Sequence, residues 1–450
     1  MGRLFGTDGA RGIANLELTC ELAMQIGRAA VVVLTKETAH KPKIVIARDT
    51  RISSEMLEAA LAAGLCSVGA DAVILGVIPT PAASYLVSYY GADAGVMISA
   101  SHNPVEFNGI KLFASTGYKL PDALEEQIEE LILDHPEKIE RKSGTELGRI
   151  SACCTAVQDY ISHLLSTMDV SLSGISVALD CANGSASATA REAFSRLGAK
   201  VHMLSDQPDG TNINKDCGST HMEALARYVS ETPGLIGGFA FDGDADRCLA
   251  VDENGNRIDG DQLIAAFAKQ LKAENRLVSN TAVVTVMSNF GMHDFEKREG
   301  VRIVKTAVGD RYVLEEMLKN GYNLGGEDSG HIILSDYANT GDGQLTALQM
   351  LRICEKTGKP LSELASVMQK SPQVLRSVRA TTEDKKRYLK IPAIADVIQE
   401  AETALGEDGR VLVRASGTEP LIRVMLEGSD TAEIENYCTK ICRTIEENIG

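Results

Sequence analysis

A strand–turn–helix–strand pattern occurs three times in this chain, and this repetition constrains the fold more than any other feature. The apolar, β-branched runs that open the three occurrences are residues 43–47, 175–179 and 281–286. A polar turn and a segment with helical apolar spacing follow each run, and a second apolar run completes each unit at 72–75, 200–203 and 301–304. Such alternation is typical of mixed or parallel sheets covered by helices on both faces, with functional groups in the turns at the strand ends.

The C-terminal part follows a different pattern. Two apolar runs, 411–414 and 421–426, flank the turn 415–420, and an amphipathic helix is expected from about Thr431 to Asn448. We therefore predict three similar mixed-sheet α/β domains followed by a smaller α+β domain. The polar segments between the units place the domain bounds at 1–148, 149–253, 254–370 and 371–450.

Composition narrows the class of protein. The chain has 450 residues, 44% of them apolar and 24% charged, which is ordinary for a soluble enzyme with several cores. A formal charge of -17, 4% aromatic residues and no Trp argue against a nucleic-acid partner. The N-terminus is charged, and no apolar run approaches the roughly 20 residues that a bilayer requires. The ten cysteines form no CxxC pair and suggest buried free thiols. We expect a cytoplasmic protein without a membrane partner.

The segment Ser99–Pro104 places a hydroxyl at the end of a buried strand. The apolar run 95–98 precedes it, His102 lies beside Ser101, and Pro104 enforces the turn. We predict a nucleophile at Ser101; the alternative from these residues alone is an ordinary capped turn.

Alternating carboxylates make residues 239–247 a candidate metal site. Asp242, Asp244 and Asp246 follow an apolar strand, and such oxygen ligands suit Mg²⁺ or Ca²⁺. The spacing also matches positions 1, 3 and 5 of an EF-hand. That reading fails because Arg247 stands where the loop needs glycine and because a strand, not a helix, enters the loop. The remaining alternative is a solvated acidic turn.

Two further loops carry polar groups in ligand-like arrangements. A glycine-rich turn at 325–331 could bind sugar hydroxyls, although a simple hairpin turn is equally consistent with it. The loop 414–420 has the ingredients of an anion cradle, with Arg423 as a second cation, although Arg414 could instead pair with Glu419. The candidate ligand groups of the two loops are Glu327, Ser329, Arg414, Ser416, Gly417, Thr418 and Arg423.

These loops occur in an order that resembles the α-D-phosphohexomutases over nearly the whole chain. Within that superfamily the motif sequences are most similar to those of the bacterial subgroup that acts on glucosamine phosphates. The motifs that carry the resemblance are residues 4–12, 98–104, 108–111 and 209–214. The resemblance implies an active site in a central cleft, Mg²⁺ as cofactor, a phosphosugar substrate and a homodimer.

Carried over to this sequence, the resemblance assigns a role to each candidate residue. It implies that Ser101 is phosphorylated and that Asp242, Asp244 and Asp246 hold Mg²⁺ together with a phosphoserine oxygen. The loop with Glu327 and Ser329 would bind the sugar, and the loop with Arg414, Ser416, Gly417 and Thr418 would bind phosphate. The residues expected to move protons, balance charge or shape the serine loop are Arg11, His102, Lys111, Arg247 and His331.

The implied reaction interconverts glucosamine 6-phosphate and glucosamine 1-phosphate through a 1,6-bisphosphate, and it supplies UDP-N-acetylglucosamine synthesis. One departure bears on the substrate, because Asp328 stands where the subgroup commonly has glutamine. Action on glucose or mannose phosphates is therefore the alternative. A metal-dependent phosphomonoesterase is a third reading, but a hydrolase needs no cradle for a second phosphate.

Overall fold

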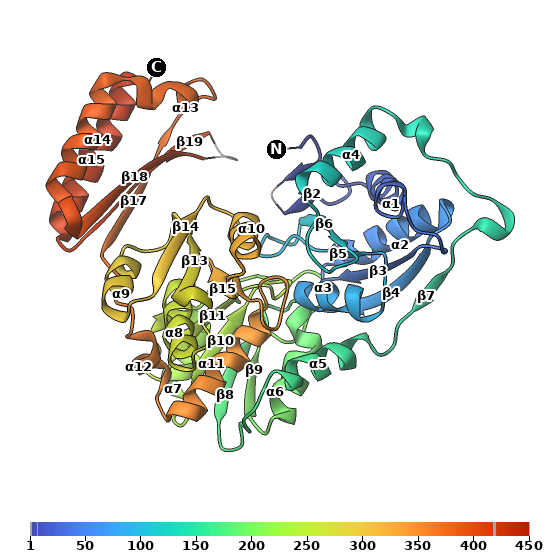
Figure 1. The fold of residues 1–450 in the computed structure, drawn as a ribbon, viewed down its shortest axis with the longest axis horizontal. Helices are drawn as coiled ribbons and strands as arrows, with labels where there is room; N and C mark the ends of the chain where they lie inside the picture. The colour runs from blue at the N-terminus through green and yellow to red at the C-terminus, as the bar shows by residue number, and fades with distance from the viewer. Residues whose placement is uncertain (1, 7, 417–419, 450) are drawn as a thin grey trace. The chain divides into compact units, whose positions relative to one another are not determined.

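The computed structural model describes residues 2–6, 8–416 and 420–449, and its chain divides into two compact units. Unit 1 comprises residues 1–287 and 301–367, and unit 2 comprises residues 288–300 and 368–450. The sheets of the three predicted α/β units all lie in unit 1, and the C-terminal sheet lies in unit 2 (Figure 1).

The first sheet is mixed, with the strand order β1-β2-β6-β5-β3-β4-β7. Its parallel centre is β3 between β4 and β5, while β6 runs antiparallel to both β5 and β2. The strands are β1 (Phe5–Gly6), β2 (Gly9–Ile13), β3 (Lys43–Arg48), β4 (Asp71–Val77), β5 (Ala94–Ile98), β6 (Phe107–Ala114) and β7 (Ile150–Ala152).

Helices cover both faces of this sheet because β3 is apolar on both sides. Ile44 and Ile46 pack with α1 (Cys20–Leu34), α2 (Ile52–Ser67) and α4 (Asp122–Leu133) in one core. On the opposite face, Gly95 makes room for α3 (Thr80–Tyr89), since a Cβ at Gly95 would overlap the Val87 side chain. The predicted α/β layering is confirmed here.

The second and third sheets are also mixed, with the orders β12-β11-β10-β8-β9 and β14-β13-β15-β16. The second contains β8 (Ser176–Asp180), β9 (Lys200–Leu204), β10 (Gly237–Phe241), β11 (Cys248–Asp252) and β12 (Arg257–Ile258). The third contains β13 (Thr281–Thr285), β14 (Arg302–Thr306), β15 (Leu324–Gly326) and β16 (Ile332–Leu334). The accompanying helices of unit 1 are α5 (Ala156–Ser166), α6 (Ala190–Arg196), α7 (Glu223–Glu231), α8 (Gly260–Ala273), α10 (Asp310–Asn320), α11 (Gly343–Thr357) and α12 (Leu361–Ala365).

Unit 2 is the smaller α+β body that the sequence predicts. Its antiparallel sheet has the order β17-β19-β18, and α14 and α15 share an apolar core with that sheet. The elements are α9 (Gly291–Glu299), β17 (Gln373–Arg379), α13 (Asp384–Arg387), α14 (Pro392–Leu405), β18 (Gly409–Ala415), β19 (Leu421–Gly428) and α15 (Thr431–Asn448). The strands around 411–426 and the final helix match the prediction, whereas β17 and α14 were not foreseen.

The four domain bounds stay predictions, but two sheets extend beyond them. β7 pairs with β4 and so continues the first sheet past residue 148. β12 pairs with β11 and continues the second sheet past residue 253. Both are short strands at the edge of their sheets, and each follows the polar segment that suggested a linker.

A common connection positions the predicted loops. The serine loop joins β5 to β6, the acidic loop joins β10 to β11, and the glycine-rich loop joins β15 to β16. Each connects a strand with a parallel partner to an antiparallel neighbour, so each loop leaves the carboxyl edge of its sheet. The loop after Ala415 likewise follows β18 and precedes its antiparallel neighbour β19.

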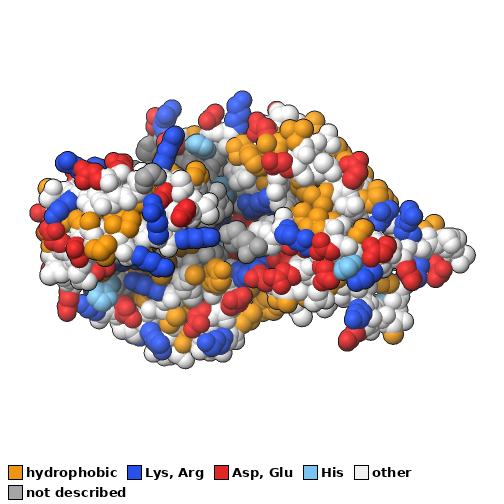
Figure 2. All heavy atoms as spheres, turned by 90° about the horizontal axis from the view of Figure 1, so that it is seen from above, with side chains coloured by type: hydrophobic (Ala, Val, Ile, Leu, Met, Phe, Trp, Pro, Cys, Tyr) orange, Lys and Arg blue, Asp and Glu red, His pale blue; other side chains and the backbone are white. Residues whose placement is uncertain are grey.

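Charges of both signs share the surface (Figure 2), and the cysteines form no disulfide among the described residues. On the face drawn in Figure 2, Lys and Arg side chains alternate with Asp and Glu, so the negative charge is interrupted at short intervals. The cysteines are free, as expected, and six of the ten are buried, whereas Cys20, Cys66 and Cys153 are partly exposed and Cys154 is exposed. Among the described residues, no helix combines the length and the apolar character needed to cross a bilayer.

Candidate active site

Ser101 lies buried in the loop after β5 in a conformation that few serines adopt. Its φ is 52°, in the left-handed region, which costs on the order of 1–3 kcal/mol and persists only where the surroundings enforce it. Its Oγ donates to Asp242 Oδ2 at 2.5 Å, and its N–H donates to Ser99 Oγ at 3.0 Å. The fold thus holds one hydroxyl against the acidic loop at the cost of local strain.

His102 does not form a conventional base for that hydroxyl. Its Nδ1 lies 3.4 Å from Ser101 Oγ, farther away than the Asp242 carboxylate. Burial, assisted by the neighbouring Arg247 cation, lowers the pKa of His102 to about 4. The ring is therefore neutral at neutral pH, and the serine proton points to Asp242.

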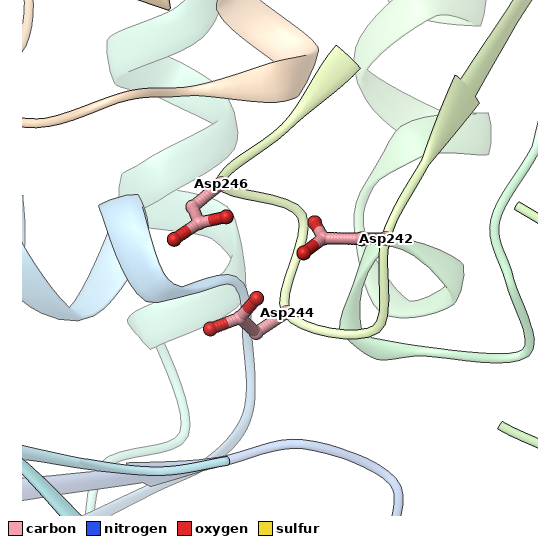
Figure 3. Close-up of side chains that lie close together, drawn as sticks. All are labelled: Asp242, Asp244 and Asp246. Carbon is pink, nitrogen blue, oxygen red and sulfur yellow. The ribbon is translucent and has the colours of Figure 1, made fainter. Parts of the chain in front are cut away.

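Three aspartates converge in the loop between β10 and β11 (Figure 3). Asp242, Asp244 and Asp246 are at most 4% exposed, and one oxygen of each lies within 4.8 Å of the others. Ala245, with a φ of 56°, provides the sharp turn that brings them together. The preceding β10 strand rules out the helix that an EF-hand would require.

The protein balances these carboxylates only in part. Burial and then the charges of Asp246 and Asp244 raise the pKa of Asp242 well above its ordinary value. Burial also opposes ionisation of Asp246, but Lys111 and His331 outweigh it and lower the pKa of that carboxyl. One carboxylate of the three thus lacks sufficient positive charge around it.

The loop fits a divalent cation with oxygen ligands. Asp244 Oδ1 and Asp246 Oδ1 are buried, and neither has a hydrogen-bond partner within the described part of the chain. Buried carboxylate oxygens without donors are costly unless a cation neutralises them. Hard oxygen ligands at this spacing suit Mg²⁺.

Lys111, on β6, is the main protein cation of the site. Its Nζ lies 2.8 Å from Asp244 Oδ2, 2.9 Å from Asp8 Oδ2 and 3.7 Å from Asp246 Oδ2. Burial disfavours the ammonium, but Asp244 and Asp8 outweigh burial, so the pKa of Lys111 lies above its ordinary value. Lys111 is accordingly a fixed positive charge. Thr80 Oγ1 donates to the same Asp244 oxygen at 2.6 Å and orients it.

A second ionic cluster adjoins the first. Lys119 Nζ lies 2.5 Å from Asp8 Oδ1 and 2.5 Å from Asp310 Oδ2, and Arg11 also pairs with Asp8. Sequence reasoning placed Arg11 in the site but missed Lys119 and Asp310. No local pattern marks them, because the contact between Lys119 and Asp310 spans 191 residues of chain.

The glycine-rich loop faces a cavity of about 340 Å³ beside the aspartates. His331 Nε2 accepts from Gly341 N–H at 3.0 Å, which leaves its Nδ1 proton to face Asp246 Oδ2 at 3.6 Å. Glu327 Oε1 accepts from Gly309 N–H at 3.1 Å, and burial raises the pKa of Glu327. Ser329 Oγ is buried, with no hydrogen-bond partner among the described residues. Acceptors and donors are thus available for a polar ligand.

Arg247 connects the acidic loop with this cavity. Its backbone N–H donates to Asp242 Oδ1 at 3.2 Å, and its Nε lies 4.0 Å from Asp246 Oδ1. Burial disfavours the guanidinium charge, but these carboxylates keep the pKa of Arg247 raised. Arg247 is a cation at the cavity wall.

The predicted phosphate cradle lies in unit 2. Arg414 on β18 stands directly opposite Arg423 on β19 in the sheet register, and Ser416 follows β18. Burial and then the Arg423 charge lower the pKa of Arg414. Like charges facing each other across a strand pair are destabilising, and a bound anion would relieve this. Gly417 and Thr418, also assigned to the cradle, lie outside the described residues.

Unit 1 brings most of the predicted residues together, and unit 2 holds a separate group. The predicted residues that line the cavity in unit 1 are Arg11, His102, Asp246, Arg247, Glu327, Ser329 and His331. Ser101, Lys111, Asp242 and Asp244 join this set through the contacts given above. Asp8 and Asp310 also line the cavity, and both were missed as site residues although Asp8 lies within one of the recognised motifs.

Comparison with known proteins supports one family. Models of the phosphoglucomutase/phosphomannomutase alpha/beta/alpha domains I, II and III match residues 2–138, 158–255 and 259–371. The model of the C-terminal domain of that family matches residues 378–444. The chain is 56% identical over 450 residues to the phosphoglucosamine mutase of Acetivibrio thermocellus, covering 100% of both chains. It is 56% identical to that of Clostridium beijerinckii, covering 99% of each.

Solved structures share the fold. A phosphoglucomutase/phosphomannomutase family protein from Burkholderia thailandensis matches with a TM-score of 0.82 at 22% identity, over 99% of this chain and 98% of that one. The N-acetylphosphoglucosamine mutase of Aspergillus fumigatus, solved with GlcNAc-6P and magnesium, matches with a TM-score of 0.71 at 17% identity, over 99% and 95%. With all four domain models matched in order along the chain, this protein belongs to the phosphoglucomutase/phosphomannomutase family.

Proposed function

We propose that this chain is an intramolecular phosphotransferase that interconverts glucosamine 6-phosphate and glucosamine 1-phosphate, in support of UDP-N-acetylglucosamine synthesis. The observation that carries the proposal is the placement of the buried Ser101 hydroxyl 2.5 Å from Asp242 in the three-aspartate loop. The relatives at 56% identity over the full chain are phosphoglucosamine mutases, and the choice of glucosamine as the sugar rests on this similarity.

Ser101 carries the phosphoryl group in this reaction. In the first transfer, the sugar O1 bonds to phosphorus as the bond from Ser101 Oγ breaks, and the O1 proton leaves to a basic group. The resulting 1,6-bisphosphate then reorients end for end in the site. Ser101 Oγ attacks the 6-phosphoryl group, and glucosamine 1-phosphate is released as the freed O6 takes a proton. In-line transfer of this kind depends on positioning and on charge neutralisation more than on covalent chemistry by the protein.

The charged residues of unit 1 serve that neutralisation. Asp242, Asp244 and Asp246 would hold Mg²⁺, which would supply Lewis-acid stabilisation of the phosphoryl group. Lys111, fixed between Asp244 and Asp8, and Arg247 at the cavity wall add positive charge from the protein. Arg11 and His331 complete the polar wall of the cavity, and His102 shapes the serine loop.

The two remaining loops hold the substrate. Glu327 and Ser329 bind sugar hydroxyls, and the carboxylate of Asp328, which lines the same cavity, attracts the 2-ammonium group. Arg414, Ser416, Gly417, Thr418 and Arg423 bind the phosphate that is not reacting. The 1-phosphate and the 6-phosphate must each occupy this cradle in turn. Two opposed guanidinium groups can bind either phosphate, whereas a pocket shaped for one end of the sugar could not. We also propose a homodimer that acts in the cytoplasm.

A side-by-side assay tests the reaction and its substrate. Turnover is measured with the 6-phosphates of glucosamine, glucose and mannose in the presence of Mg²⁺ and a catalytic amount of the matching 1,6-bisphosphate. We expect the highest kcat/KM with glucosamine 6-phosphate. Preference for glucose or mannose 6-phosphate would overturn the substrate, and release of inorganic phosphate at the turnover rate would overturn the transfer.

Intact mass spectrometry tests the carrier. A fraction of the protein incubated with bisphosphate should gain the mass of one phosphoryl group, and Ser101→Ala should lose both this gain and turnover. Ser88→Ala, which removes an exposed hydroxyl on α3, is the matched control and should behave as the unaltered protein does. Phosphorylation that survives Ser101→Ala would place the carrier elsewhere.

A further inference from the structure

We propose that Arg51 and Asn214 are positioning residues that clamp the backbone of the serine loop and aim Ser101 at the transferring phosphoryl group. The proposal rests on the phosphoryl-carrier function of Ser101 given above. Neither residue lies among the groups assigned to metal, sugar or phosphate, and sequence reasoning placed Arg51 in an ordinary polar turn.

Arg51 is a buried guanidinium whose donors are directed at backbone carbonyls. It is 0% exposed and belongs to the loop between β3 and α2. Its Nη1 donates to Pro104 O at 2.5 Å, and its Nη2 donates to Ser101 O at 3.0 Å and to Asn103 O at 2.8 Å. One side chain thus holds three carbonyls of the loop that carries the nucleophile.

Asn214, in the segment between β9 and α7, donates hydrogen bonds to two of the same carbonyls. Its Nδ2 donates to Ser101 O at 2.8 Å and to Asn103 O at 3.1 Å. Asn214 itself has a φ of 57°, a conformation that asparagine tolerates better than most residues. Two independent side chains therefore converge on one pair of oxygen atoms.

Asp49 fixes the clamp and connects it to the serine backbone. It is 0% exposed, and its Oδ2 accepts from Arg51 Nε at 2.8 Å and from Ser99 Oγ at 2.6 Å. Ser99 Oγ in turn accepts the N–H of Ser101. The carbonyl and the N–H of Ser101 are thus both tied, directly or through Ser99, to one buried ion pair.

The clamp has a consequence for phosphoryl transfer. A phosphorylated serine carries about two negative charges near neutral pH, and backbone carbonyl oxygens turned toward it would repel it. Because Arg51 and Asn214 donate to the Ser101 and Asn103 carbonyl oxygens, both oxygens are held in fixed positions and already accept hydrogen bonds while Ser101 Oγ meets Asp242. Arg51 and Asn214 also enforce the left-handed φ of Ser101, whose relaxation would move Oγ.

Substitution of Arg51 by lysine tests the clamp. Lysine keeps the charge but offers its donors from one point, so it cannot span Asp49 and three carbonyls. We expect kcat with glucosamine 6-phosphate to fall about 100-fold, the scale of a misplacement near 1 Å, with KM changed by less than about twofold. Arg352→Lys is the matched control, because Arg352 is also buried and paired with carboxylates, Asp169 and Glu274, but contacts no residue of the site. It should lose thermal stability with kcat kept within about twofold of the unaltered protein.

A second variant, Asn214→Asp, tests the clamp independently and replaces Arg51→Lys if that variant does not fold. The substitution preserves shape and tolerance of the left-handed φ but replaces the donor with an acceptor facing two carbonyls. We expect kcat to fall at least about tenfold, again with KM nearly constant. Asn212→Asp, in the same loop with its amide directed at Gln207 O, is the control and should retain kcat.

The outcomes separate this inference from the proposed reaction. If the unaltered protein turns over no phosphosugar, the proposed function fails, whereas an active protein makes the clamp testable with the sugar that it accepts. The clamp is overturned if folded Arg51→Lys or Asn214→Asp keeps kcat within about threefold of the unaltered protein. It is also overturned if kcat and KM change together in proportion to the loss of thermal stability, as a merely structural role would give.

Discussion

Replacing Asp244 by asparagine should nearly abolish turnover while leaving the fold almost as stable as before. Lys111 Nζ lies 2.8 Å from Asp244 Oδ2, and at an effective dielectric near 20 this attraction is about 6 kcal/mol. Oxygens of Asp242 and Asp246 lie within 4.8 Å of one of Asp244, and each carboxylate, when ionised, repels it by at least about 3.5 kcal/mol at that dielectric. The attraction lost and the repulsion relieved therefore cancel to within a few kcal/mol.

Metal binding, in contrast, is weakened, because Asp244→Asn removes one charged ligand and no other change compensates for it. We expect kcat to fall at least about 100-fold at saturating substrate, since even outer partners of a metal site are worth about 10–100-fold. The melting temperature in a chelating buffer should stay close to that of the unaltered protein. Mg²⁺ should raise the melting temperature of the unaltered protein, because it binds the folded state, but not that of the variant.

Asp252→Asn provides the opposite pattern as a control. Asp252 is a buried aspartate that accepts the N–H groups of Asn254 and Asn256 in a turn of the second sheet. Its substitution should lower stability by about 1 kcal/mol and leave kcat within about twofold. The reasoning about Asp244 is refuted if the Asp244→Asn protein is unfolded in chelator to a degree that accounts for its loss of activity. It is also refuted if Mg²⁺ still raises the melting temperature of this variant.

Two further substitutions test the electrostatics of unit 1. Lys111→Met leaves Asp8 and Asp244 without their shared cation, so the free energy of unfolding in chelator should drop by about 3–5 kcal/mol, with partial recovery in Mg²⁺; an unchanged denaturation midpoint would contradict this. Burial raises the pKa of Asp342 from 3.8 to about 6, so the folded state favours the protonated carboxyl. The stabilisation that this protonation gives the folded state is complete below pH 4 and is lost as the pH rises through 6. Asp342→Asn, which keeps an acceptor for Leu345 N–H, should therefore be more stable than the unaltered protein by up to about 3 kcal/mol at pH 7.5 and lose that advantage near pH 4. An advantage that does not vary with pH would rule out titration of Asp342 as its cause.

Local patterns were sufficient for the layers of the fold and for the acidic loop. The alternation of β-branched runs with helical spacing depends on short stretches of chain, and β3, β8 and β13 begin within a residue of their predicted positions. Asp242, Asp244 and Asp246 come from one turn, so their convergence needs no knowledge of distant segments. Where residues near in sequence make the feature, the sequence predicts it.

The surroundings of the site depend on segments far apart in the chain. Thr80 meets Asp244 across 164 residues, and Lys119 meets Asp310 across 191, so no spacing could reveal either contact. The burial of Arg51 was not foreseen for another reason. A charged residue in a polar turn is usually exposed, whereas here three backbone carbonyls and Asp49 accept from four of the five N–H groups of the guanidinium. Burial of a charge is decided by its partners, and sequence alone does not place them.

The ammonium of Lys111 beside the aspartates bears on the order in which this protein is assembled. Zinc fingers and similar small domains cannot fold until their metal arrives, because metal binding supplies their folding free energy. Here Lys111 offsets part of the charge of the aspartates, so we expect the chain to fold before any cation is bound. Metal loading then becomes a separate, late and reversible event. The amount of active protein should consequently follow the free Mg²⁺ of its surroundings, while the amount of folded protein does not.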